Sequence, residues 1–269
     1  NEKTLCIDTN SVLEKITSKT KVIMAVHLAG LICPNIDELK EICEDKKIFL
    51  LEDAAQAHGA IFDDKKAGSI GDAGSFSFFP TKPMTSGEGG MIVTNDDALA
   101  KTAVSLRHHG IQKRDYQDKF GYNWRLSEVN AILGIYQLRR LEEFIKVRNG
   151  IAEKYNRRLK NVKKAKLIEV PKNFRHSYYK YVVILPFDSA EFQKNLKEKY
   201  DIDTSYLYYP PVHLQPLYRE KFGYREGMLP VAEDVLKRMV CLPMFVGLTD
   251  EQIEYVLNSF EAELASMPA

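Results

Sequence analysis

The sequence predicts an α/β protein with a mostly parallel central sheet, followed by a second, smaller α/β domain. Three observations predict this fold class: continuous apolar runs typical of buried parallel strands, amphipathic helix patterns between them, and a change in the succession of predicted strands and helices near Gly150. At 269 residues the chain is long enough for two domains. We place the large domain at 1–148 and the small C-terminal domain at 149–269.

The first half of the chain alternates strand and helix patterns. Residues 21–27 (KVIMAVH) and 48–51 (IFLL) are predicted strands. Between them, Asn35 is expected to cap a helix, with Glu38 completing the capping box. A strand, a helix and a strand in this order imply a right-handed crossover between parallel strands. Further predicted elements are strands at 74–79 and 90–93 and a helix at 96–107.

The middle of the chain predicts one long helix that begins after Ser127 and continues into the second domain. Its apolar positions keep helical spacing at Val129, Ile132, Leu133, Tyr136, Leu141, Phe144 and Ile145. The second half then predicts a strand at 178–185, helices at 189–200 and 230–239, and a closing helix capped by Thr249 and Gln252.

Composition narrows the class of protein. Lys and Arg total 38 and Asp and Glu total 37, so a net charge of +1 argues against a dedicated nucleic-acid or membrane-surface binder. No apolar run is long enough to cross a bilayer, and no signal segment opens the chain. The cysteines lack C-x-x-C spacing and are typical of core residues in a reducing compartment. The four cysteines are Cys6, Cys33, Cys43 and Cys241. We therefore expect a cytoplasmic protein without a metal site.

Two side chains suggest chemistry because each follows a predicted strand. Asp53 comes directly after IFLL, at the sheet edge where ligands bind in open parallel sheets. Alone, it is better explained as a helix cap or a loop ion pair. Lys82 follows GSFSFFP and precedes the glycine-rich TSGEGG; alone, it is better explained as a surface lysine whose stem covers Phe79. Together they suit a pyridine-ring cofactor, since the carboxylate keeps the ring nitrogen protonated while a partly desolvated amine forms an imine.

Weaker candidates accompany this pair. Ser77 lies five residues before Lys82, and its hydroxyl is a possible phosphate donor. His108 and His109 offer too few ligands for a metal, so a structural or substrate-facing role is favoured. The loop 206–213 (YLYYPPVH) is either a packed linker between domains or part of a binding site.

Several segments together resemble the DegT/DnrJ/StrS family of sugar aminotransferases. They include EDAAQAHGA (52–60), the run around GSFSFFPTKPMTSGEGG (74–90) and GYNWRLSEVNAILG (121–134). In the second half, YYPPVHLQPLY (208–218) and LPVAEDVLKRMVCLPM (229–244) match as well. The likeness runs over essentially the whole chain, and the segments keep the family's order and spacing.

The resemblance implies a fold-type I transferase that uses pyridoxal 5′-phosphate (PLP). Lys82 matches the lysine that carries the cofactor, and Asp53 matches the aspartate at the pyridine nitrogen. Gln56 matches the residue beside the phenolic oxygen, and Ser77 matches a phosphate donor. Asn123 matches an asparagine that reaches the phosphate of a neighbouring subunit, which implies a homodimer. More weakly, His213 matches a region near the substrate.

The same resemblance implies the reaction. The relatives move an amino group, usually from L-glutamate, to a nucleotide-linked keto sugar, in the biosynthesis of amino sugars and of cell-surface polysaccharides such as lipopolysaccharide. Two alternatives stay open: a PLP-dependent sugar dehydratase, and a truncated family member without catalytic activity. Family dehydratases carry histidine where Lys82 stands, which favours transamination.

The chain departs from the family at its N-terminus. Relatives begin with a further stretch of about a hundred residues of the large domain, which supplies a phosphate-binding turn and a ring-stacking residue. We therefore expect residues 1–269 alone to hold PLP poorly.

Overall fold

The computed structural model describes residues 1–114 and 116–267, which divide into two compact units. The first, here called the sheet unit, comprises Cys6–Ile145 and Pro171–Ser177. The second, the C-terminal unit, comprises Asn1–Leu5, Lys146–Val170 and Tyr178–Ala269. Each unit has its own buried apolar cluster, as expected of parts with separate cores.

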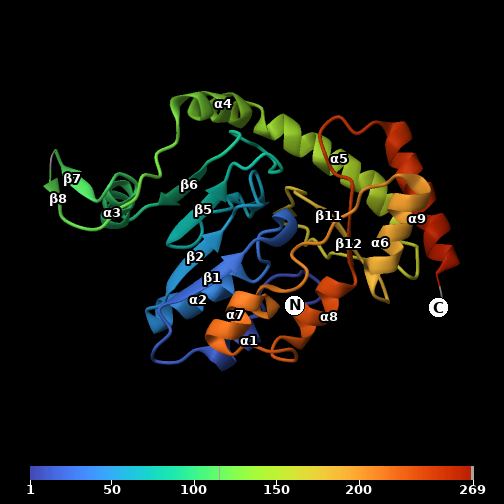
Figure 1. The fold of residues 1–269 in the computed structure, drawn as a ribbon, viewed down its shortest axis with the longest axis horizontal. Helices are drawn as coiled ribbons and strands as arrows, with labels where there is room; N and C mark the ends of the chain where they lie inside the picture. The colour runs from blue at the N-terminus through green and yellow to red at the C-terminus, as the bar shows by residue number, and fades with distance from the viewer. Residues whose placement is uncertain (115, 268–269) are drawn as a thin grey trace. The chain divides into compact units, whose positions relative to one another are not determined.

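A four-stranded sheet forms the centre of the sheet unit, in the order β1-β2-β5-β6 (Figure 1). The first three strands are parallel, and β6 runs antiparallel to β5. The predicted mostly parallel sheet is therefore confirmed, with an antiparallel strand added at one edge. The strands are β1 (Val22–Val26), β2 (Phe49–Asp53), β5 (Ala73–Ser77) and β6 (Gly90–Thr94).

The helix between the first two strands completes the predicted crossover. Its apolar side chains Ile36, Leu39 and Cys43 are buried in the core cluster of the sheet unit. It is α2 (Ile36–Lys46), and the other helices of this unit are α1 (Thr9–Lys15), α3 (Asp97–Arg107) and α4 (Glu128–Arg139), with a 3-10 turn η1 at Leu28–Gly30. Two smaller sheets are made of short strands: β10 (Phe174–Arg175), β3 (Ile61–Phe62) and β4 (Lys65–Lys66) form one, and β7 (Ile111–Lys113) and β8 (Tyr116–Gln117) form the other.

The predicted cap of α2 is wrong. Asn35 precedes the helix, but its side chain accepts no hydrogen bond from the first turn. Its amide instead donates to the Ile7 carbonyl at 3.1 Å and contacts the Thr9 hydroxyl. Tertiary partners for the amide outcompete the local cap, and Asp37 and Glu38 favour the helix N-terminus through its dipole.

The long helix predicted after Ser127 is two helices. Ser127 caps α4 as expected, accepting from the Asn130 N–H at 3.2 Å. Arg140 then ends α4, and α5 (Leu141–Leu159) begins at the next residue. No side chain of α4 is buried within the chain, although its sequence is rich in apolar residues. Only the later part of the predicted stripe, Phe144 and Ile145, is buried.

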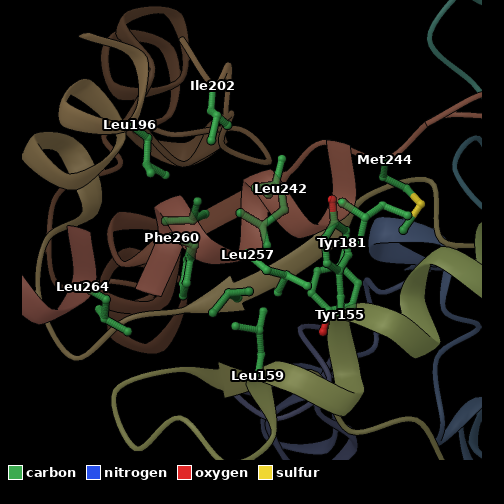
Figure 2. Packing of buried hydrophobic residues seen from close by; sticks show 14 of the residues in the cluster. Tyr155, Leu159, Tyr181, Leu196, Ile202, Leu242, Met244, Leu257, Phe260 and Leu264 are labelled. Carbon is green, nitrogen blue, oxygen red and sulfur yellow. The ribbon is translucent and has the colours of Figure 1, made fainter. Parts of the chain in front are cut away.

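The C-terminal unit packs helices on a three-stranded antiparallel sheet, in the order β12-β11-β9. Figure 2 shows its core, in which Tyr155, Leu257 and Phe260 are buried with side chains from both strands and helices. The elements are β9 (Lys166–Leu167), β11 (Tyr181–Ile184), β12 (Met239–Leu242), α6 (Ser189–Tyr200), η2 (Val212–Leu214), α7 (Pro216–Phe222), α8 (Pro230–Lys237) and α9 (Asp250–Ser266).

The predicted closing helix is confirmed with its cap. Thr249 Oγ1 accepts from the Gln252 N–H at 3.2 Å, and Gln252 Oε1 accepts from the Thr249 N–H at 3.0 Å. Within the described ranges 1–114 and 116–267, no helix is long and apolar enough to cross a membrane.

Candidate functional site

Asp53 and Ser77 lie at the carboxyl ends of the neighbouring parallel strands β2 and β5. Asp53 is the last residue of β2 and pairs with Ser75, two residues before the end of β5. Its Oδ1 accepts from the Ala55 N–H at 3.1 Å, and among described residues nothing hydrogen-bonds to Oδ2. The sheet therefore presents a half-buried carboxylate with one unoccupied oxygen at the edge that ligands use.

Lys82 lies in a closed loop that follows β5. Its backbone N–H donates to the Phe79 carbonyl at 3.0 Å, which makes a tight turn just after the strand. The loop is fastened at its base, because Ser86 N–H donates to the Phe78 carbonyl at 3.0 Å and Phe78 N–H donates to the Gly89 carbonyl at 2.8 Å. The half-buried lysine thus extends from a backbone that is held on both sides.

Gln56 is buried beside the same edge, three residues after Asp53. Its Oε1 accepts from the Ala29 N–H at 2.7 Å. Ala29 adopts a φ of 58°, a left-handed conformation that is costly for alanine and aims this N–H at the glutamine. Because that contact takes the oxygen, the side-chain NH₂ is the end suited to donating to a ligand oxygen.

His58 is a buried residue of this site that the sequence did not single out. Its ring is 3% exposed and lies 5.2 Å from the Phe76 ring centroid and 5.9 Å from that of Phe78. Neither ring nitrogen makes a regular hydrogen bond to a described residue, although the Ser77 backbone lies close enough to favour protonation. Burial, then the nearby Lys82 charge, lowers the pKa of His58 to about 4. His58 is therefore neutral at pH 7.

Asn123 lies apart from these residues, on an exposed part of the sheet unit. It forms an isolated antiparallel bridge with His108. Both neighbouring rings, Tyr122 and Trp124, are more than half exposed (52% and 65%) and stack with a centroid separation of 3.9 Å. Within this chain Asn123 is exposed and lies between the two residues of an exposed aromatic pair in the sequence.

The histidine pair near Asn123 is held by one arginine. Arg125 Nη1 lies 2.7 Å from His108 Nδ1 and 3.2 Å from His109 Nε2. Since a guanidinium only donates, His108 Nδ1 and His109 Nε2 both accept, and these two nitrogens are not available to a metal. Within residues 1–114 and 116–267, no cluster of three or more His, Cys, Asp or Glu is arranged to hold a metal ion.

His213 belongs to the C-terminal unit and is already occupied. It is buried, and its Nε2 lies 2.9 Å from Glu233 Oε1. Glu233 also accepts from the N–H groups of Gly227 and Leu229, at 2.8 and 3.0 Å. Glu233 therefore holds the loop that precedes α8 onto the first turn of that helix, and His213 links η2 to the same carboxylate.

The donor set at the sheet edge fits a phosphorylated pyridine aldehyde. Asp53 offers a free carboxylate oxygen for a protonated ring nitrogen, Lys82 offers an amine, and Gln56 an amide N–H for a phenolic oxygen. Ser77 offers a hydroxyl that is weakly engaged, accepting from the Phe79 N–H at 3.4 Å. Each of these side chains suits a different part of PLP, and all four lie on two adjacent parallel strands or in the segments that follow them.

Known proteins resemble this chain in both sequence and fold. A family model described as the DegT/DnrJ/EryC1/StrS aminotransferase family matches residues 1–261. GDP-perosamine synthase of Escherichia coli O157:H7 is 32% identical over 96% of this chain and 70% of that protein. The dTDP-3-amino-3,4,6-trideoxy-alpha-D-glucose transaminase of Micromonospora megalomicea subsp. nigra is 35% identical over 94% of this chain and 68% of its own length.

Solved structures agree with the sequence relatives. The structure of TlmJ, an aminotransferase from Streptoalloteichus hindustanus, matches with a TM-score of 0.91 at 30% identity. The match covers 100% of this chain and 72% of that chain.

Proposed function

Because the chain belongs to the DegT/DnrJ/EryC1/StrS aminotransferase family and is a PLP-dependent sugar aminotransferase, we propose that it aminates a nucleotide-linked keto sugar, with L-glutamate as the amino donor. The observation that carries the proposal is the set of Asp53, Ser77 and Lys82 at one sheet edge. The relatives named for GDP- and dTDP-linked amino sugars support the substrate class, and cell-surface polysaccharide or amino-sugar biosynthesis is the setting we propose.

Each proposed role follows from the chemistry of one side chain. Bound PLP would supply an electron sink for the negative charge left when the amino donor loses its α-proton. Lys82 would hold the cofactor through Nζ and then move that proton. Asp53 would keep the pyridine nitrogen protonated, and Gln56 and Ser77 would orient the phenolic oxygen and the phosphate.

We further propose that the enzyme is a cytoplasmic homodimer in which Asn123 reaches the partner's cofactor phosphate. The support for a dimer is the exposed apolar surface of α4, where Val129, Ile132 and Tyr136 are 77%, 56% and 61% exposed. Surfaces of this kind are normally covered by another protein surface. The proposed division at 148/149 assigns the cofactor site to the first domain and His213 to the second. His213 is proposed as a substrate-binding residue.

Asn123→Ala should weaken PLP binding about 10- to 100-fold, as the loss of one hydrogen bond to a charged phosphate does. Dimerisation and the fold should be retained. An absorbance titration of the apoenzyme measures the PLP dissociation constant, and sedimentation velocity measures the dimer. Asn95→Ala, an exposed asparagine of the same unit, is the control. Unchanged PLP affinity in dimeric Asn123→Ala would refute the shared site.

A transamination assay tests the proposed function. We expect L-glutamate with one of a panel of GDP- and dTDP-linked keto sugars to yield the amino sugar and 2-oxoglutarate, since the amino group replaces the keto oxygen. Mass spectrometry of both products measures the reaction, and the Lys82→Ala variant is the blank.

The assay needs two forms of the protein, because the chain spans about 70% of its relatives' length. Residues 1–269 are assayed alone and joined to the N-terminal part of a relative's large domain. If a PLP-loaded protein aminates no keto sugar in the panel, the proposed substrate class is wrong. If it removes a hydroxyl group instead, the dehydratase is the correct function.

A further inference from the structure

Glu52, the residue before Asp53, forms a buried hydrogen-bonded pair with His27 that has no part in the roles proposed above. The side chains of Glu52 and His27 are both fully buried (0% exposed), with His27 Nε2 at 2.8 Å from Glu52 Oε2. Burying a carboxylate costs free energy unless its lone pairs are filled by donors. The surroundings of Glu52 therefore show what the pair does.

Three backbone N–H groups of the turn before β5 also donate to Glu52. Gly68 donates to Oε2 at 2.8 Å, while Ile70 and Gly71 each donate to Oε1 at 2.7 Å. With His27, these donors saturate the carboxylate. Burial alone would raise the pKa of Glu52, but the hydrogen bonds from His27, Gly71 and Gly68 lower it. Glu52 is a carboxylate at neutral pH.

The tautomer of His27 is fixed by its second contact. The Cys33 N–H donates to His27 Nδ1 at 3.2 Å, so Nδ1 carries no proton and Nε2–H points at Glu52. The pair therefore consists of a histidine that accepts from backbone through Nδ1 and donates to the carboxylate through Nε2. Both partners bond to backbone N–H groups, so the pair holds the backbone in place and does not act as an acid–base pair.

The turn that surrounds Glu52 approaches the sheet too closely for side chains. A Cβ atom at Gly71 would lie 2.6 Å from the Leu50 carbonyl oxygen, and one at Gly74 would lie 2.4 Å from the Gly68 Cα. The turn is thus pressed against β2 and leads directly into β5. One carboxylate joins the end of β1, the end of β2 and the start of β5.

These three points are next to the cofactor-binding side chains. Successive side chains of a strand point to opposite faces, so fixing Glu52 in the core also fixes the direction of Asp53 on the other face. The turn at 68–71 likewise fixes the register in which Asp53 pairs with Ser75, and hence where β5 delivers Ser77 and Lys82.

We propose that Glu52, together with His27, is a positioning residue for the PLP site: it sets the spacing between Asp53 on β2 and Ser77 on β5, and takes no part in proton transfer. This inference rests on the proposed function only in that PLP binds at this edge. It holds for any amino acceptor.

Glu52→Gln tests the proposal with almost no change of shape. An amide NH₂ in place of either carboxylate oxygen would face a backbone N–H, so the turn must shift. We expect PLP affinity to fall about tenfold or more, and kcat with saturating PLP to fall about 10- to 100-fold, because small displacements of reacting groups are costly. KM for the amino donor and the pH profile of kcat should stay unchanged. A shifted pH profile would place Glu52 in proton transfer and overturn the proposal.

Glu263→Gln is the matched control for losing a buried carboxylate. Glu263 is 1% exposed and accepts from Asn195 and Lys199 within the C-terminal unit. Both variants should lower the melting temperature, but only Glu52→Gln should weaken PLP binding. If the two variants bind PLP equally well, Glu52 is merely structural and the proposal is wrong.

A measurement on the unaltered protein covers the case in which Glu52→Gln does not fold. Nitrogen-15 NMR of the apoenzyme should show His27 as the Nε2–H tautomer, with slow exchange of that proton, because the Cys33 N–H occupies Nδ1. A His27 that carries its proton on Nδ1, or that adopts the Nε2–H tautomer only after PLP is added, would show that the pair does not organise the site. PLP binding and the half-reaction with L-glutamate need no sugar, so failure of every keto sugar in the assay leaves this test intact.

Discussion

Lys82→Ala should abolish transamination, lowering kcat by at least about 10⁴-fold, because in the proposed mechanism one amine serves as both the covalent attachment and the proton carrier. Lys82 comes after a turn closed by its own N–H to Phe79, in a loop fastened to Phe78 at both ends. Other lysines of the sheet unit, such as Lys65 and Lys66, lie in a separate short hairpin and cannot replace it from an equally fixed position.

Three measurements check the Lys82 prediction. The visible absorbance of the holoenzyme should be lost or shifted in Lys82→Ala. Borohydride treatment of the unaltered protein should add the mass of reduced cofactor to the peptide that contains Lys82, and to no peptide in the variant. Lys66→Ala, an exposed lysine of the same unit, is the control and should keep both properties. Normal turnover in Lys82→Ala would remove this residue from the mechanism.

The central sheet could be predicted because its strands are buried on both faces and therefore read as apolar runs. The runs at 21–27 and 48–51 became β1 and β2, each within two residues of the expected ends. The strand β12 was missed, because the helix predicted to 239 overran its start. Its sequence MVCL is apolar without a period, so the pattern alone does not separate it from a helix end.

Helix boundaries were less predictable because tertiary contacts decide them. The 3.6-residue period continues across Arg140, so the stripe gave no sign that α4 ends there. What changes is local charge: Glu142 and Glu143 favour a new helix N-terminus, and Arg140 pairs with Glu143 at 3.1 Å. The stripe also predicted an apolar helix, but could not indicate that none of its side chains is buried within the chain.

The positions of Asp53 and Ser77 at the ends of neighbouring strands, and of Lys82 in the loop after β5, could be predicted because apolar runs mark these strands. Glu52 and His58 were missed because their roles depend on contacts with distant residues, at the turn before β5 and at Phe76 and Phe78. A signal was present for Glu52: a charged residue inside a buried strand requires saturating donors. His213 was singled out by the sequence, but its contact with Glu233 could not be predicted, because the two residues are 20 positions apart.

Asp53→Ala should leave the fold intact and lower kcat about 10²- to 10³-fold, the effect of removing one preorganised electrostatic contact from a transition state. The carboxylate is half-buried at the end of β2, and its only bond to a described residue joins Oδ1 to the N–H of Ala55. Oδ2 is therefore the atom that would face a pyridinium N–H, and its charge would stabilise the protonated ring. Losing one local hydrogen bond should cost stability only about 1 kcal/mol.

Asp53→Asn separates charge from shape in the same position. Its amide can still accept from Ala55 N–H, so the local turn should persist, but it cannot hold a proton on the pyridine nitrogen. We therefore expect Asp53→Asn to lose nearly as much of kcat as Asp53→Ala, with PLP still attached to Lys82. Asp64→Asn is the control, because Asp64 is exposed at a φ of 66° and asparagine tolerates that conformation. Rapid-mixing kinetics of the half-reaction with L-glutamate measure the rate for each variant. If Asp53→Ala, loaded with PLP, reacts as fast as the unaltered protein, Asp53 only ends the strand, and another group must protonate the ring.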